Sequence, residues 1–101
     1  MKIAVYAIAK NEAKHVQRFM ASTKGADGVF VLDTGSTDDT VKALIAAGAK
    51  VEQRFIEPWR FDTARNTALA MVPVDIDACV ILDLDEVLVP GWRAALEKEL
   101  G

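Results

Sequence analysis

Three acidic residues at the end of an apolar run are the side chains of this sequence best suited to chemistry. Asp83, Asp85 and Glu86 follow the apolar run 78–82. Side chains alternate between the two faces of a strand, so both aspartates of an Asp-x-Asp pair point toward one side. Mg²⁺ and Mn²⁺ prefer oxygen ligands and would relieve the repulsion between the carboxylates. The pattern predicts a divalent metal site at Asp83 and Asp85, with Glu86 as a third oxygen ligand. The alternative is a strand end where Asp83 caps a loop and the others are solvated.

Polar residues also follow two earlier apolar runs. Lys10-Asn11-Glu12 comes after the run 3–8, and Asp33-Thr34-Gly35-Ser36 comes after the run 29–32. Ligands of open parallel sheets bind at the carboxyl ends of the strands, so we expect all three groups to converge on one edge. Asp33 is predicted to bind the base or ribose of a ligand. For Asn11 and Glu12, a ligand role and a role at the start of a helix are both open.

A second Asp-x-Asp, at 75–77, precedes its apolar run instead of following it. We therefore expect it in a turn at the opposite edge of the sheet.

Aromatic, basic and amide side chains crowd the segment 59–66. Asp62 is predicted to cap a helix that begins there. We expect Trp59 and Phe61 to be structural residues that fill the core. Arg65 and Asn66 are predicted to lie near the ligand, where Arg65 could pair with a phosphate or with the aspartates at the strand ends, Asp33 and Asp83.

These residues need a scaffold, and the apolar periodicity predicts alternating strands and helices. The expected strands are 3–8, 29–32, 49–55 and 78–82, and the expected helices are 11–24, 37–47, 62–71 and 90–100. Such alternation is typical of an α/β fold, with a mostly parallel four-stranded sheet flanked by helices. Ser36 and Asp39 match a capping box for the second helix, and Gly48 is expected to end it.

Composition restricts the class of protein. With 101 residues, 51% of them hydrophobic, the chain can form one domain around one core. Its net charge of −3 and the lack of a long basic stripe argue against binding to nucleic acid or to an anionic membrane. Neither a signal peptide nor an apolar run of about 20 residues is found, so we expect a soluble, cytoplasmic protein. The lone Cys79, expected in the core, fits a reducing compartment. His15 is assigned no role.

Four stretches, in this order and spacing, resemble the N-terminal half of an inverting family-two glycosyltransferase with the GT-A fold, a Rossmann-like fold. They are 9–12, 31–38, 61–66 and 82–86. The resemblance implies a nucleotide-diphosphate sugar as donor, Mn²⁺ or Mg²⁺ bridging its phosphates, and a role in cell-surface polysaccharide synthesis. It implies that Asp85 is the principal metal ligand and that Asp83 binds the metal or the ribose. The implied donor-binding residues are Asn11, Glu12, Asp33, Arg65, Asn66 and Asp83. Many relatives carry a second aspartate where Thr34 stands.

The resemblance also implies that the acceptor site and the general base lie beyond the acidic motif, in a region that this chain lacks. We therefore expect a half domain that binds the donor weakly, hydrolyses sugar nucleotides slowly and transfers little or no sugar. The edge strand and apolar helix faces of a half domain favour self-association into a homo-oligomer.

Two other functions compete with this interpretation. The stretch 81–88 resembles the first motif of haloacid-dehalogenase-like phosphatases, in which Asp83 would be the nucleophile and Asp85 the acid. That motif usually begins the protein, however, and Glu86 stands where a glycine is usual. A non-catalytic module that binds a nucleotide or a protein accommodates the missing general base.

Overall fold

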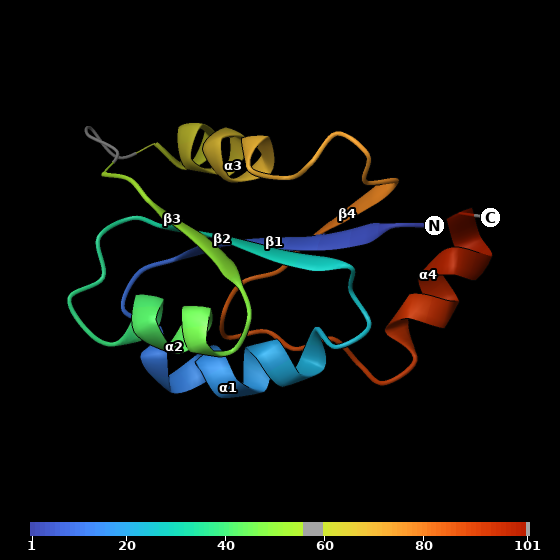
Figure 1. Cartoon of the computed structure of the whole chain (residues 1–101), viewed down its shortest axis with the longest axis horizontal. Helices are drawn as coiled ribbons and strands as arrows, with labels where there is room; N and C mark the ends of the chain where they lie inside the picture. Colours follow the sequence, from blue (N-terminus) through green and yellow to red (C-terminus); the bar gives the residue numbers. More distant parts are fainter. Residues whose placement is uncertain (56–59, 101) are drawn as a thin grey trace.

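The computed structural model describes residues 1–55 and 60–100, which contain four strands alternating with four helices (Figure 1). In chain order they are β1 (Ile3–Ala9), α1 (Ala13–Ser22), β2 (Gly28–Asp33), α2 (Thr40–Ala46), β3 (Lys50–Gln53), α3 (Phe61–Ala70), β4 (Ala78–Ile81) and α4 (Trp92–Leu100). The predicted order of elements is confirmed. Most of them are shorter than predicted, and α2 begins three residues later than expected.

The strands form one sheet in the order β3-β2-β1-β4, and every pairing is parallel within the described residues. The chain moves outward from β1 to β2 and β3, and then crosses back to place β4 on the other side of β1. The strand order therefore reverses beside β1. In open α/β sheets such a reversal opens a crevice at the carboxyl ends of the strands, where ligands bind.

Helices cover both faces of the sheet, with α1 and α2 on one side and α3 on the other (Figure 1). Side chains of β1 alternate between the two layers: Val5 and Ala7 pack with α1 and α2, whereas Ala4 and Tyr6 pack with α3. Because the central strand is buried on both faces, it is apolar throughout, as is usual for parallel sheets.

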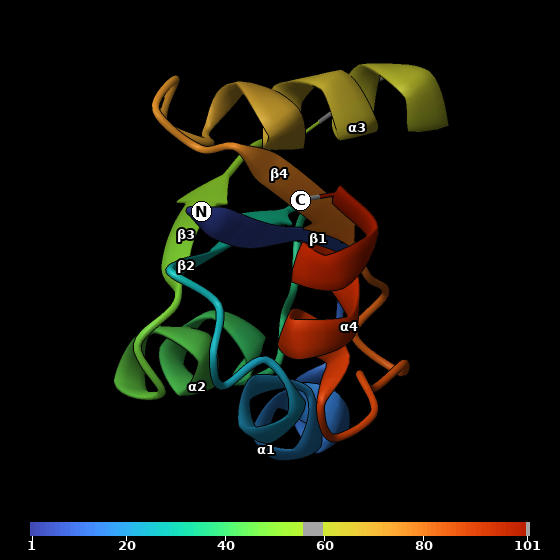
Figure 2. The same ribbon diagram turned by 90° about the vertical axis from the view of Figure 1, so that its right-hand side faces the viewer.

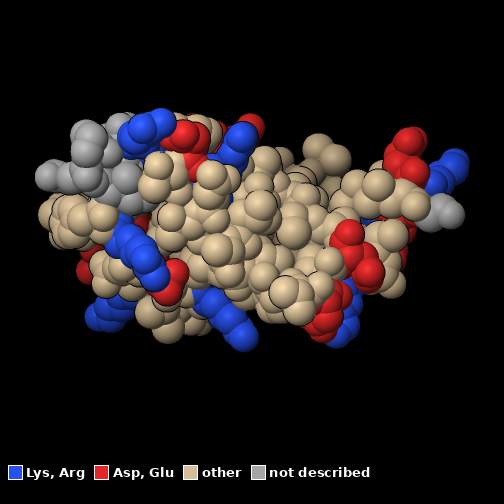
Figure 3. Space-filling model, turned by 90° about the horizontal axis from the view of Figure 1, so that it is seen from above, with Lys and Arg blue, Asp and Glu red and all other residues tan. Residues whose placement is uncertain are grey.

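Cys79 is exposed, so its predicted place in the core is wrong. The reason is that β4 is an edge strand, while α3 packs mainly over β1 and β2. Cys79 is paired with Ala4, and Ile81, two residues along on the same face of β4, is 43% exposed. This exposure of apolar side chains fits the face of the molecule seen from the α3 side, where uncharged residues cover a broad central area (Figure 3). The reducing compartment inferred from this cysteine stays a prediction.

Phe61 is 54% exposed, which corrects its predicted role as a core residue. The inward face of α3 is formed instead by Ala64 and Ala68, one turn apart and both fully buried. Small side chains let the helix lie close to the sheet. Trp59, predicted to share the role of Phe61, lies outside the described residues.

The last helix lies beside the N-terminus, at the amino ends of the strands (Figure 2). Arg93 donates hydrogen bonds to the carbonyls of Met1 and Gly25, each at 2.5 Å, and to the Asp27 carboxylate at 2.9 Å. α4 is therefore anchored away from the carboxyl edge of the sheet. None of the described helices combines the length and apolar character needed to cross a membrane.

Candidate functional site

The parallel register brings the polar ends of β1, β2 and β4 to one edge of the sheet. Ala9 is level with Asp33, and Leu82 donates its N–H to the Tyr6 carbonyl at 3.2 Å, so Asp83 extends toward the same edge. The convergence expected from the sequence is confirmed for these three loops.

The other Asp-x-Asp lies at the opposite edge, as predicted. Asp77 accepts a hydrogen bond from the Lys2 N–H at 2.7 Å, and Asp75 forms an ion pair with the Lys2 ammonium at 2.6 Å. These two carboxylates hold the turn before β4 against the start of β1.

Asp33 is fully buried, and its carboxylate is turned into its own loop. One oxygen accepts the N–H groups of Gly35 and Ser36 at 3.0 and 2.9 Å, and the other accepts the Ser36 hydroxyl at 2.5 Å. Gly35 has φ of +129°, a conformation that other residues rarely adopt. Asp33 therefore shapes the loop after β2, and its predicted contact with a base or ribose stays a prediction.

The loop after β2 and the first residue of α2 also satisfy the amides that lead into α1. Asn11 N–H donates to the Ser36 hydroxyl at 2.8 Å and Glu12 N–H donates to the Thr40 hydroxyl at 2.9 Å. Amides at the start of a helix have no carbonyl partner within that helix. The two loops are consequently joined by hydrogen bonds from one backbone to the side chains of the other.

The predicted capping box at Ser36 and Asp39 is wrong. Asp39 is the N-cap residue of α2 but makes no side-chain cap bond, and Ser36 binds Asp33 and Asn11 instead. The side chain that caps α2 is Asp38, which accepts the Thr40 N–H at 2.9 Å. A local sequence rule failed here because the serine is used by a neighbouring loop.

Asn11 and Glu12 do not cap α1 with their side chains. Asn11 has φ of +54°, and its side-chain oxygen accepts the Thr37 N–H at 2.7 Å. The Glu12 carboxylate lies 3.6 Å from the His15 ring. Asn11 therefore links the two loops, and a donor contact by either residue stays a prediction.

The acidic motif follows the end of β4 at Ile81 and forms a turn, so the strand alternation expected for its two aspartates does not extend to it. Leu82 and Leu84 are buried, while Asp83 and Asp85 are exposed. The Glu86 carboxylate accepts a hydrogen bond from the Asp83 N–H at 2.9 Å, and the Glu86 N–H donates one to the Asp83 carbonyl, also at 2.9 Å.

Glu86 is therefore part of a tight turn. Among the described residues, no three acidic, histidine or cysteine side chains are grouped closely enough to hold a metal, so the predicted cluster of three carboxylates is not formed. Two accessible aspartates still fit Mg²⁺ or Mn²⁺, since such ions are often held by one or two carboxylates together with substrate phosphates.

Replacing Asp83 with asparagine is expected to stabilise the metal-free protein slightly at neutral pH. Partial loss of hydration, then the negative charges of Glu86 and Asp85, raise the pKa of Asp83. A raised folded-state pKa favours folding at low pH, and this advantage is lost as the pH rises through that pKa. Because the site is exposed and screened, we expect a gain of at most about 0.5 kcal/mol at pH 7. Thermal unfolding as a function of pH measures it, and a variant less stable than the wild type at pH 7 would contradict it.

Arg65 and Asn66 lie on α3, and among the described residues neither forms a hydrogen bond or ion pair with the acidic motif. The Arg65 guanidinium stands 6.0 Å from the centre of the Phe61 ring, and no ion pair joins it to Asp33 or Asp83, all of which are described. Asp62, predicted to cap α3, is instead the second residue of the helix and pairs with Arg60 at 3.3 Å. The nearness of Arg65 and Asn66 to a ligand stays a prediction.

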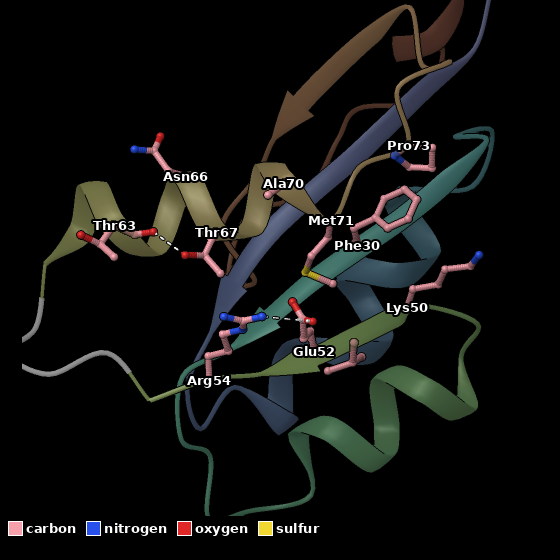
Figure 4. A pocket seen from close by; sticks show the side chains of 11 residues that line it. Phe30, Lys50, Glu52, Arg54, Thr63, Asn66, Thr67, Ala70, Met71 and Pro73 are labelled. Carbon is pink, nitrogen blue, oxygen red and sulfur yellow. Dashed lines mark hydrogen bonds and ion pairs between the residues drawn. The ribbon is translucent and has the colours of Figure 1, made fainter.

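A groove of about 830 Å³ runs between α3 and β3 (Figure 4). Asn66 and Thr67 of α3 line one wall, Glu52 and Arg54 line the other, and Phe30 lies in the floor. The Arg54 N–H donates to the Asp33 carbonyl at 2.9 Å, so one end of the groove reaches the carboxyl edge. Sequence reasoning missed this groove, although its signal is present in the small and polar residues repeated along α3, Thr63, Asn66, Thr67 and Ala70.

The sequence is similar to several bacterial proteins, although no protein-family model matches it. An uncharacterized glycosyltransferase of Rickettsia felis is 44% identical over 59 residues, which make up 57% of this chain and 20% of that protein. A TPR repeat-containing protein of Synechococcus elongatus is 36% identical over 98% of this chain and 24% of its own length. The chain thus spans about a quarter or less of these curated relatives.

Solved structures show the same fold. Glucosyl-3-phosphoglycerate synthase of Mycobacterium tuberculosis superimposes with a TM-score of 0.71 and 30% identity, over 85% of this chain and 35% of that one. The same enzyme with Mn²⁺, uridine diphosphate and glucosyl-3-phosphoglycerate gives a TM-score of 0.68. TarS of Staphylococcus aureus, residues 1–349, gives a TM-score of 0.73 at 21% identity, which is a likeness of fold alone.

Proposed function

Because the chain has the sequence and fold of an N-terminal partial GT-A glycosyltransferase domain, we propose that it binds a nucleotide-diphosphate sugar through a divalent metal at Asp83 and Asp85. One observation carries the proposal: these two accessible aspartates lie at the carboxyl edge, beside the reversal of strand order. The similar synthase that holds Mn²⁺ and uridine diphosphate supports this choice of ligand.

In this proposal Asp85 is the principal metal ligand, and Asp83 binds the metal or the ribose. Asn11, Glu12, Asp33, Arg65 and Asn66 complete the donor site. The acidic motif repels a diphosphate on its own, and a bound divalent cation would neutralise the phosphates and stabilise the departing nucleotide diphosphate. The loops after β1 and β2, already joined by hydrogen bonds, hold their donor-binding residues before the ligand arrives.

We assign no general base or acceptor site to the described residues. The proposed activity of the chain alone is donor binding with at most slow hydrolysis of the sugar nucleotide. The setting we propose, by family resemblance, is cell-surface polysaccharide synthesis. A non-catalytic nucleotide-binding module remains the second candidate function. It is favoured by the Glu86 carboxylate, one oxygen of which accepts the Asp83 N–H and so helps to close a turn.

Calorimetric titration of uridine and guanosine diphosphates, with and without Mn²⁺, tests the proposal. We expect uridine diphosphate to bind only with Mn²⁺, and Asp85→Asn to weaken that binding by about 100-fold, because a first ligand of the metal is lost. Asp75→Asn is the matched control. It removes the same charge from the other Asp-x-Asp, at the opposite edge, and should leave affinity unchanged.

The outcomes separate the candidate functions. Absence of binding under every condition, or equal loss in both variants, would remove the donor site. If the nucleotide binds, hydrolysis of its glucose conjugate followed by NMR distinguishes an enzyme from a binding module.

A further inference from the structure

Asp38 lies between the starts of two helices and binds the backbone of both. One carboxylate oxygen accepts the Ala13 N–H of α1 at 3.2 Å. The other accepts the Thr40 N–H of α2 at 2.9 Å and also the Thr40 hydroxyl. Thr40 is fully buried, and its hydroxyl oxygen in turn accepts the Glu12 N–H. One side chain therefore caps its own helix and a helix that begins 25 residues earlier in the chain.

This arrangement completes a regular pattern at the start of α1. The consecutive amides of Asn11, Glu12 and Ala13 donate to the side chains of Ser36 and Asp38 in the loop after β2 and of Thr40, the first residue of α2. The backbone contact from Thr34 N–H to the Ala9 carbonyl, at 3.0 Å, continues the same junction toward the sheet. A rotation or shift of the loop after β1 would strain or break several of these hydrogen bonds at once.

We propose that Asp38 is a positioning residue for the donor site, an inference that rests on the proposed function. By holding the start of α1 against the loop after β2, it keeps Asn11 and Glu12 at a constant position relative to Asp33. Asp38 acts through other residues in this proposal, because its two oxygens accept hydrogen bonds from the starts of the two helices. When the two loops are already held in place, less conformational entropy is lost on binding, and the affinity for the ligand is higher.

A carboxylate suits this position better than a neutral side chain. Hydrogen bonds from Thr40, first from its hydroxyl and then from its N–H, lower the pKa of Asp38, so it is charged at neutral pH. Charged acceptors form stronger hydrogen bonds with backbone amides at helix starts. An asparagine could replace only one of the two acceptor oxygens, because its amide nitrogen is a donor.

The test compares Asp38→Ala, Asp38→Asn and Asp39→Ala in the whole chain. Asp39 is the matched control, because it is adjacent, exposed and equally charged, and it makes no side-chain cap bond. The affinity for uridine diphosphate with Mn²⁺ is measured by calorimetry, at a temperature where all variants are folded. Hydrogen exchange of the Ala13 and Thr40 amides is measured by NMR without ligand.

We expect Asp38→Ala to speed exchange at both amides and to weaken nucleotide binding about tenfold, with Asp38→Asn intermediate. Leu44→Ala, which destabilises α2 from its buried face, should leave affinity unchanged and so excludes a general effect of stability. Equal affinities of Asp38→Ala and Asp39→Ala would overturn the positioning role. If the wild type binds no nucleotide, the proposed function fails and the positioning role with it. If exchange of the Ala13 and Thr40 amides is unchanged in Asp38→Ala, Asp38 does not hold the two helix starts together.

Discussion

Asp33→Ala is expected to lower the free energy of unfolding by about 3 kcal/mol, because it removes a buried acceptor of three hydrogen bonds. The N–H groups of Gly35 and Ser36 and the Ser36 hydroxyl all lose their partner. The fully buried position of Asp33 gives water little access to replace it. Urea denaturation followed by circular dichroism measures the loss.

Asp33→Asn is the informative companion to this variant. Its side-chain oxygen can still accept the two N–H groups, so the expected loss is about half as large. Asp39→Ala, in the same loop but without a side-chain cap bond, should change stability by less than about 0.5 kcal/mol. A loss below about 1 kcal/mol in Asp33→Ala would contradict the structural role and favour a carboxylate kept for the ligand.

Phe19→Ala is expected to cost about 3–5 kcal/mol, the usual range for deleting a buried aromatic ring. Phe19 is fully buried on the inner face of α1, among Val5, Val16 and Leu44. The loss of this packing would release the helix whose first amides bind the loop after β2. In a domain of this size such a loss is a large share of the total stability.

Phe61→Ala provides the comparison, since the same ring is removed from an exposed position at the start of α3. We expect a change within about 0.5 kcal/mol, limited to the loss of its contact with Arg65. Thermal unfolding by calorimetry measures both variants. Similar losses in the two would show that Phe61 fills a core after all.

The order of strands and helices could be predicted because it depends on local patterns. Buried strands such as β2 are continuous apolar runs, and α1 repeats its apolar residues at helical spacing, with Val16 and Phe19 inward. Burial at the sheet edge could not be read from the sequence. Cys79 lies in an apolar run like those of the central strands, but its strand has no neighbour on one side and α3 lies over β1 and β2.

The candidate site likewise has features that local sequence patterns predict and features that they do not. Rules for strand ends correctly placed the residues after β1, β2 and β4 at one edge, and correctly separated the acidic motif from Asp75 and Asp77. Local rules for side-chain capping failed at Ser36, because its partner Asn11 is 25 residues away in the chain. Capping rules consider only the nearest residues, whereas hydrogen bonds form with whichever group lies closest in space.

By itself, the sequence determined the alternating α/β fold, the edge of the sheet where the acidic motif lies, and the likeness to glycosyltransferases, because each depends on residue type and spacing along the chain. Only the tertiary structure decided that Asp33 is turned inward, that Glu86 closes a turn, and that Asp38 joins two helices. Each of these depends on the direction of a polar side chain. That direction is set by the donors and acceptors that packing brings near it, often from distant parts of the chain.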